Sequence, residues 1–163
     1  MSEVIDEDEL NLHAITRLGN GDLLIVCEQG RLLLSSDDGR TWKKLRSPVT
    51  ATVFGAAAIG SSGALICGLR GQAWISDAVR SGSWKAIDTG TANALYGCTA
   101  FGRDRAALVG AEGTVLLADF ASRAARRLKS PAGGAWSTVA AGKSGLVLGG
   151  ERGLHLISPV PGK

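Results

Sequence analysis

Four ring side chains recur at similar spacing, each directly after the first residue of a repeated apolar segment: His13, Phe54, Tyr96 and Trp136. Three arginines lie in or beside the Gly-containing turns of the same repeats: Arg31, Arg70 and Arg152. Guanidinium groups stack on aromatic rings and pair bidentately with carboxylates. If the repeats superpose, these side chains converge on one face and form a platform for an acidic peptide or ligand. The alternative is that the rings pack between neighbouring structural units.

The sequence gives little support for a metal site, a disulfide framework, nucleophilic catalysis or cofactor binding. The three cysteines, Cys27, Cys67 and Cys98, are widely spaced, and the two histidines, His13 and His155, lie near opposite ends of the chain. We therefore expect reduced structural thiols and neither a metal site nor a disulfide framework. No G-x-S-x-G elbow and no phosphate-binding glycine loop occurs, so no cofactor is expected.

Composition and charge describe one folded, basic body behind an acidic leader. Residues 1–11 hold five acidic residues and no Lys or Arg, whereas the remainder carries 18 basic and 10 acidic residues. Aromatic residues make up only 5% of the chain and follow the repeat, so we do not expect nucleic-acid binding. The chain as given shows neither an 18-residue apolar run nor a signal peptide. We expect no membrane span and a cytoplasmic location, or a periplasmic one if the chain is a truncated exported protein.

A repeat of about 40 residues organises the chain. Gly30, Gly71, Gly113 and Gly153 follow one another at intervals of 41, 42 and 40 residues. Each repeat contains apolar stretches of 5–7 residues separated by Gly-rich turns, which is typical of short strands rather than helices. Four short strands per repeat predict an all-β fold, a β-propeller of about four four-stranded blades whose last blade is incomplete. The expected blades are 12–50, 53–92, 95–133 and 135–158, followed by a C-terminal tail, 159–163.

The turn before the fourth strand of the first repeat carries a defined motif, Ser-x-Asp-x-Gly-x-Thr-Trp, at Ser35, Asp37, Gly39, Thr41 and Trp42. An Asp side chain accepts hydrogen bonds from backbone N–H groups across a tight turn, and glycine supplies an unusual backbone angle. The Trp ring then anchors the hairpin by its burial. This motif resembles the Asp-box, or bacterial neuraminidase repeat. The second repeat keeps Ser83 and Trp84 around an insertion, and the third has lost the motif.

Over residues 12–158 the chain resembles the photosystem II stability and assembly factor-like family of Asp-box propellers. That resemblance implies a non-enzymatic, seven-bladed scaffold that binds protein and helps to assemble membrane protein complexes. The alternative is a sialidase-like or carbohydrate-binding propeller. A sialidase needs an arginine triad, a Tyr nucleophile and acidic partners, whereas this chain has a single tyrosine, Tyr96, with Glu112 as the nearest acid. We therefore expect no enzyme activity.

About four blades leave two unburied ends. Three arrangements follow: the leader supplies the missing strand of the last blade, four blades close alone, or two chains join into one eight-bladed ring with closed two-fold symmetry. We favour the homodimer, because the incomplete blade and both terminal faces would then be covered. The protein partner would be an acidic peptide or a membrane-complex subunit.

Overall fold

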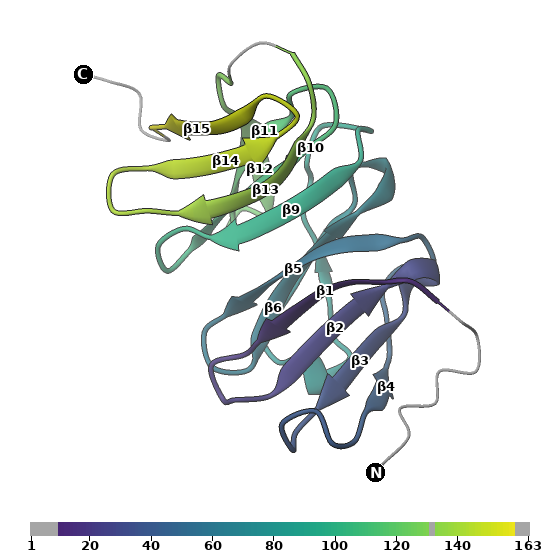
Figure 1. Cartoon of the computed structure of the whole chain (residues 1–163). Coiled ribbons are helices and arrows are strands. Elements are labelled where there is room, and N and C mark those ends of the chain that lie inside the picture. The colour runs from purple at the N-terminus through teal and green to yellow at the C-terminus, as the bar shows by residue number, and fades with distance from the viewer. Residues whose placement is uncertain (1–9, 131–132, 159–163) are drawn as a thin grey trace.

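The computed structural model describes residues 10–130 and 133–158, and it contains four antiparallel sheets set side by side in an open arc (Figure 1). The first three sheets have four strands each, in the order in which the strands follow along the chain, and the last has three. The predicted fold class, a partial β-propeller with an incomplete last blade, is confirmed. The acidic leader falls almost wholly outside the described residues, and the tail 159–163 lies outside them entirely.

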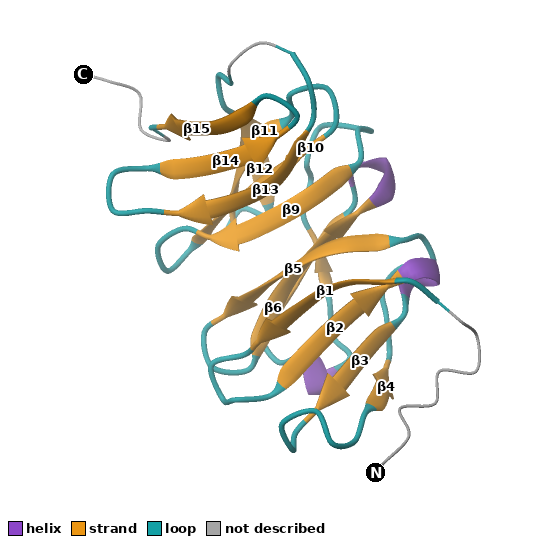
Figure 2. Cartoon of the chain, viewed as in Figure 1, coloured by secondary structure: helices purple, strands orange, loops and turns teal. Residues whose placement is uncertain are grey.

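Each sheet is one blade, and its strands are joined by short hairpins (Figure 2). Blade 1 consists of β1 (Leu12–Arg17), β2 (Leu23–Cys27), β3 (Leu32–Ser35) and β4 (Lys43–Leu45). Blade 2 consists of β5 (Val53–Ile59), β6 (Gly63–Gly68), β7 (Ala73–Ser76) and β8 (Lys85–Ala86). Blade 3 consists of β9 (Leu95–Ala100), β10 (Arg105–Gly110), β11 (Val115–Asp119) and β12 (Ala124–Arg127). Blade 4 consists of β13 (Trp136–Ala141), β14 (Leu146–Gly150) and β15 (Gly153–Ile157).

The hairpin between the second and third strands has the same backbone in the first three blades. Gln29, Arg70 and Glu112 adopt φ of 53°, 57° and 52°, and the glycine after each has φ between 65° and 68°. Two successive left-handed residues make a type I′ turn, which suits the twist of a β-hairpin. In blades 1 and 2 these turns form the short segments η1 (Glu28–Gly30) and η2 (Leu69–Gly71).

Apolar side chains between neighbouring blades form the core. Leu24, Leu32 and Leu34 of blade 1 pack with Val53 and Ile66 of blade 2. Equivalent clusters join blade 2 to blade 3 and blade 3 to blade 4. Because blades 2 and 3 bury both faces in this way, their middle strands are almost continuously apolar instead of alternating.

A polar clasp also joins blades 1 and 2. A third short segment, η3 (Val79–Ser81), follows β7 in the insertion of the second repeat. The guanidinium of Arg80 donates to both carboxylate oxygens of Asp22, with Nη2 at 2.9 Å from Oδ2, and Asp22 is only 6% exposed. The same Nη2 donates to Ser36 Oγ at 2.6 Å. The insertion therefore ties two blades together.

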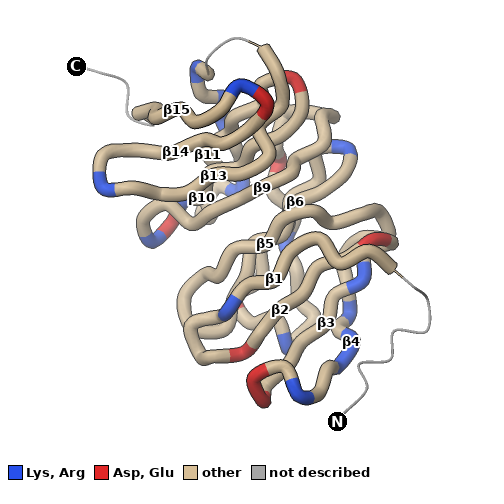
Figure 3. The backbone as a smooth tube through the Cα atoms, in the orientation of Figure 1, with Lys and Arg blue, Asp and Glu red and all other residues tan. Residues whose placement is uncertain are grey.

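The innermost strands β1, β5, β9 and β13 lie in a row along the inside of the arc, and each packs against the next (Figure 1). No close packing joins β13 back to β1 within the described part of the chain, and blades 1 and 4 occupy opposite ends of the arc. The four blades therefore form an open arc. Lys and Arg lie mostly in turns and on outer strands, as with Lys43 and Arg126 (Figure 3).

Across residues 10–130 and 133–158, no helix has both the length and the apolar character that a membrane crossing requires.

Candidate functional site

A β-bulge opens the first strand of every blade. Leu12 pairs with Cys27 and Ala14 with Val26, so that His13 is the extra residue; Phe54 and Tyr96 are the extra residues at the same place in blades 2 and 3. A bulge re-aims the side chain of its extra residue away from the regular ladder. The carbonyl just before each of these strands accepts a hydrogen bond from the turn between strands two and three, for example Glu28 N–H to Asn11 O at 3.2 Å. Each bulge is thereby held beside its own turn.

The structure brings three of the four expected rings together. The centroids of His13 and Phe54 are 5.0 Å apart and those of Phe54 and Tyr96 are 5.5 Å apart, both edge to face. Such contacts favour the edge-to-face arrangement because the rim of one ring is positive and the face of the other negative. We call this set of His13, Phe54 and Tyr96 the ring row; it crosses from blade 1 to blade 3.

The fourth expected ring, Trp136, is not in the row. Trp136 pairs with Gly150, which places it at the position of Leu12, and Ser137 is the bulged residue of blade 4. Trp136 is 1% exposed, contacts the ring of His155 at 5.2 Å, and donates from Nε1 to Ser130 Oγ at 3.2 Å. In blade 4 the hairpin between β13 and β14 is one residue shorter than in the other blades. The position counted back from Gly153 therefore falls one residue before the bulge. Trp136 therefore belongs to the core between blades 3 and 4, and it offers no surface to a ligand.

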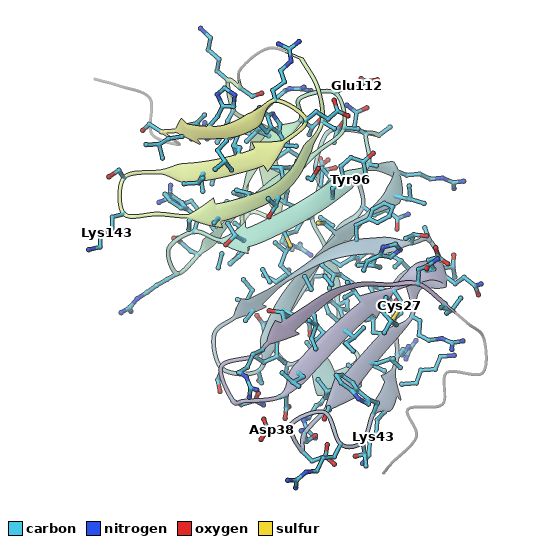
Figure 4. All side chains as sticks on the ribbon, in the orientation of Figure 1. Cys27, Asp38, Lys43, Tyr96, Glu112 and Lys143 are labelled. Atoms are coloured by element: carbon cyan, nitrogen blue, oxygen red, sulfur yellow. The ribbon has the colours of Figure 1, made fainter. Side chains whose placement is uncertain are left out.

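The polar neighbours of the ring row come mainly from the turns between strands two and three. Glu28, which the sequence pattern did not single out, lies with Oε1 3.9 Å from Nε2 of His13 and accepts a 2.9 Å hydrogen bond from Asn11 Nδ2. Arg70 is exposed at the tip of η2, and η2 packs beside β9, the strand of Tyr96. Figure 4 shows Tyr96 on β9 and Glu112 in the equivalent turn of blade 3. The equivalent turns of blades 1 to 3 therefore carry a carboxylate, a guanidinium and a carboxylate in succession, at Glu28, Arg70 and Glu112.

The other two predicted arginines have different surroundings. Arg31 is half-buried just before β3, and Arg152 is exposed in the turn of blade 4, beside Gly133. The structure thus groups Arg70 with the ring row and leaves Arg152 at the far end of the arc of turns.

Two cavities open beside these turns at equivalent places in blades 2 and 3. One, of about 280 Å³, is lined by Arg70 and its turn and by residues 86–91. The other, of about 420 Å³, is lined by Glu112, Arg127, Lys129 and Ser130. In each blade the walls are the Gly-containing turn and the segment that follows the fourth strand. Both cavities therefore carry cationic side chains at the end of the blade where the rings lie.

The five motif residues of the 35–42 turn form a closed hydrogen-bond network. The Oγ of Ser35 accepts from Gly39 N–H and donates to Asp37 Oδ1, both at 2.8 Å. Asp37 accepts from Thr41 N–H at 2.9 Å and from Thr41 Oγ1 at 2.7 Å. The two Thr41 bonds and the Ser35 hydroxyl lower the pKa of Asp37 from 3.8 to about 2. This turn lies at the outer edge of blade 1 and contributes no side chain to the ring row.

Gly39 has φ of +85°, and Trp42 Nε1 donates to its carbonyl at 3.1 Å while the indole covers Ile25 and Leu33. In blade 2, where the motif has faded, Ser76 Oγ and Trp84 Nε1 are buried without a hydrogen-bond partner within the described portion of the chain. Within the described residues, the hydrogen bonds that Ser35 Oγ and Trp42 Nε1 make in blade 1 therefore have no counterpart at Ser76 and Trp84.

The thiols lie in packing positions. Cys27 and Cys67 are buried and Cys98 is half-buried, and none of the three forms a disulfide. The hydrogen bond between the two thiols of Cys67 and Cys98, together with burial, raises the pKa of Cys67 well above its ordinary value. A thiol that stays protonated is a poor nucleophile and a poor metal ligand. Among the described residues, no group of three or more His, Cys, Asp or Glu side chains is placed to hold a metal ion.

No model of a known protein family matches this chain, and no curated protein matches its sequence. Among solved structures it is similar to YCF48 from Cyanidioschyzon merolae, with a TM-score of 0.71 and 17% identity over 93% of this chain and 54% of that one. It is also similar to YCF48 bound to D1 peptide (TM-score 0.67, 15% identity, 90% of this chain and 52% of that one). The computationally designed Ika4 protein matches with a TM-score of 0.64 and 12% identity over 97% of this chain and 100% of the other. The chain thus spans about half the length of the YCF48 chains, and it shares with all three the fold described above, a series of propeller blades.

Proposed function

We propose that this protein is a non-enzymatic binding scaffold whose ring row holds a segment of a partner protein. The observation that carries the proposal is the placement of His13, Phe54 and Tyr96 on equivalent bulges of three successive innermost strands. A bulge repeated three times aims three rings at one surface, and rings presented in this way are frequent anchors of protein interfaces.

The charges beside the rings favour an acidic segment that also carries an apolar side chain. The apolar side chain would lie on Phe54 and Tyr96. One carboxylate would pair with Arg70 beside the rings, and another with Arg152, farther along the same series of turns. Glu28 and Glu112 make the rim mixed in sign, so a uniformly acidic peptide would be repelled at some positions. The likeness to YCF48 bound to D1 peptide supports a peptide as the ligand. The assembly role implied by the photosystem II factor-like resemblance belongs to the same proposal.

The test is fluorescence anisotropy with a labelled decapeptide that contains Asp, Glu and one central Phe. We expect Tyr96→Ala to weaken binding by about 10-fold or more, as loss of a ring anchor does. We expect the double variant Arg70→Glu with Arg152→Glu to weaken it by a similar factor. The matched control is Arg123→Glu with Lys143→Glu, which changes the net charge equally on turns at the opposite ends of the strands.

Equal losses in the arginine pair and in its control would show a nonspecific charge effect and overturn the acidic-peptide assignment. Unchanged binding in both Tyr96→Ala and the arginine double variant would overturn the site. Binding of sialyllactose that competes with the peptide would favour the carbohydrate-binding alternative.

A further inference from the structure

Blade 4 exposes a face that every other blade buries. On β15, Leu154 is 78% and Leu156 is 64% exposed, and Val147 beside them on β14 is 37% exposed. In the ladders, Leu154 occupies the position of Leu32, Ala73 and Val115, because each is paired with the equivalent residue of the strand before it. Those three residues are buried, each against the blade that follows. Leu154 is exposed because the described chain has no fifth blade.

Blade 1 exposes the complementary face. Leu12 is 54% and Ile15 is 61% exposed on β1, next to the small cluster of Ile25, Leu33 and Trp42. The position of Leu12 is held in later blades by Val53, Leu95 and Trp136, all of them buried against the blade before. The described chain therefore makes the same blade-to-blade interface three times. One side of that interface stays uncovered on blade 4, and the other side stays uncovered on blade 1.

We propose that a second copy of this chain covers both ends, with blade 4 of each copy packed on blade 1 of the other. A second copy is the partner we infer because each internal interface packs the face equivalent to Leu154 and Leu156 against the face equivalent to Leu12 and Ile15. Blade 1 of a second copy presents that second face. Two such junctions bury both ends of both chains and close with two-fold symmetry. They give eight blades, within the range that closed propellers adopt, whereas three copies would give twelve.

This assembly would also complete the ring row. β13 of one copy would lie beside β1 of the other, in the way that β1 lies beside β5 within the chain. Ser137, the bulged residue of blade 4, would then neighbour the His13 of the second copy. The ring row would occur twice around one central opening, and each would be bounded by residues of both copies. The dimer does not depend on the peptide proposal, because its apolar contacts come from the exposed leucine and isoleucine side chains of β15 and β1 and not from the ring row.

The test is light scattering behind size exclusion at several concentrations of the full chain. We expect the wild type to have a mass near twice 16.8 kDa. Leu154→Glu and Ile15→Arg should each be monomeric, with a dissociation constant raised by about 100-fold or more, because each places a charge in both junctions. The matched control is Leu69→Glu, an exposed apolar residue that lies in a turn and on neither end face. Its mass should equal that of the wild type.

Each altered side chain is exposed, and circular dichroism of the variants should show unchanged strand content. An equimolar mixture of Leu154→Glu and Ile15→Arg retains one unaltered junction and places opposite charges in the other, so we expect a mixed dimer. A wild type that is monomeric at all concentrations would overturn the proposal, as would a ladder of larger species, since an open chain of copies is not a closed ring. Loss of the dimer in only one of the two variants would overturn the pairing of blade 4 with blade 1, and a mixture that stays monomeric would count against it equally.

Discussion

Gly110 provides a sharp test of how the bulged ring positions are held. It pairs with Leu95, the residue before Tyr96, and it occupies the same position as Gly68 and Gly150. A Cβ added at Gly110 would overlap the carbonyl oxygen of Ala94 and would lie 2.9 Å from Leu95 Cα, both of them backbone atoms. Carbon atoms in contact normally lie about 3.5–4.0 Å apart, so the start of β9 would have to move.

The expected cost of Gly110→Ala has two parts. Forcing an extra methyl group into a packed site costs about 1–3 kcal/mol. The shift also weakens the 2.9 Å hydrogen bond from Ala111 N–H to Ala94 O, for about 1 kcal/mol more. A total of about 3 kcal/mol would lower the Tm of a chain of this size by about 6–12 °C. Because Tyr96 follows the displaced residue, peptide binding should weaken as well.

Urea unfolding followed by circular dichroism, together with the anisotropy titration, measures both effects. Gly142→Ala is the matched control, since a Cβ there meets nothing closer than 3.5 Å and the backbone does not lie in the left-handed region. It should change the free energy of unfolding by less than about 0.5 kcal/mol. A Gly110→Ala protein as stable as this control would refute the claim that backbone contact at this position holds the bulge.

Three further outcomes are expected. The pKa of Asp37 falls from 3.8 to about 2 on folding, so the stabilising contribution of this carboxylate is present above pH 3.8 and is lost as the pH falls through 2. In calorimetry from pH 7 to pH 2, the Tm difference between the wild type and Asp37→Asn should therefore shrink between pH 3.8 and pH 2. A Tm difference that stays constant would contradict this role of Asp37. Trp136→Phe removes the bond to Ser130 and leaves a void in the core between blades 3 and 4, so it should lower the free energy of unfolding in urea by about 2–3 kcal/mol. The peptide dissociation constant should stay unchanged. Weakened binding by a variant as stable as the wild type would show that Trp136 contributes to the site. The buried Cys67 should not react with DTNB in the folded protein, and all three thiols should react in urea; rapid reaction of Cys67 without denaturant would contradict its burial.

The fold was accessible from the sequence because its signals are local and repeated. Four glycines at nearly equal intervals and apolar runs of strand length predict four blades without any long-range information, and the described residues form four sheets. The ring positions in blades 1–3 were accessible for the same reason. In the 35–42 turn, Asp37 and Trp42 make the local contacts that an Asp in a tight turn and a large ring beside it are expected to make.

What the repeat could not supply is register within blade 4. Counting back from Gly153 places Trp136 one residue off, because the shorter hairpin lies between the two positions. Counting back from Gly150 gives the same error, because the shorter hairpin lies between Trp136 and Gly150. An Asn-Gly pair such as Asn20-Gly21 is typical of a two-residue type I′ turn, but the backbone here differs. Only Gly21 has positive φ, and Leu18 N–H bonds to Asp22 O at 2.8 Å around a three-residue loop.

The consecutive strand order within each blade has a consequence for synthesis. Every described sheet is built from neighbouring segments, so no blade waits for a strand from the far end of the chain. Each blade can form soon after its own residues leave the ribosome and then serve as the surface on which the next one folds. Short sequence separation between contacts favours fast folding and limits the time for which strand edges are exposed to aggregation. Among the four described blades, the face of Leu154 and Leu156 is the last to appear, after the other three blades have been synthesised.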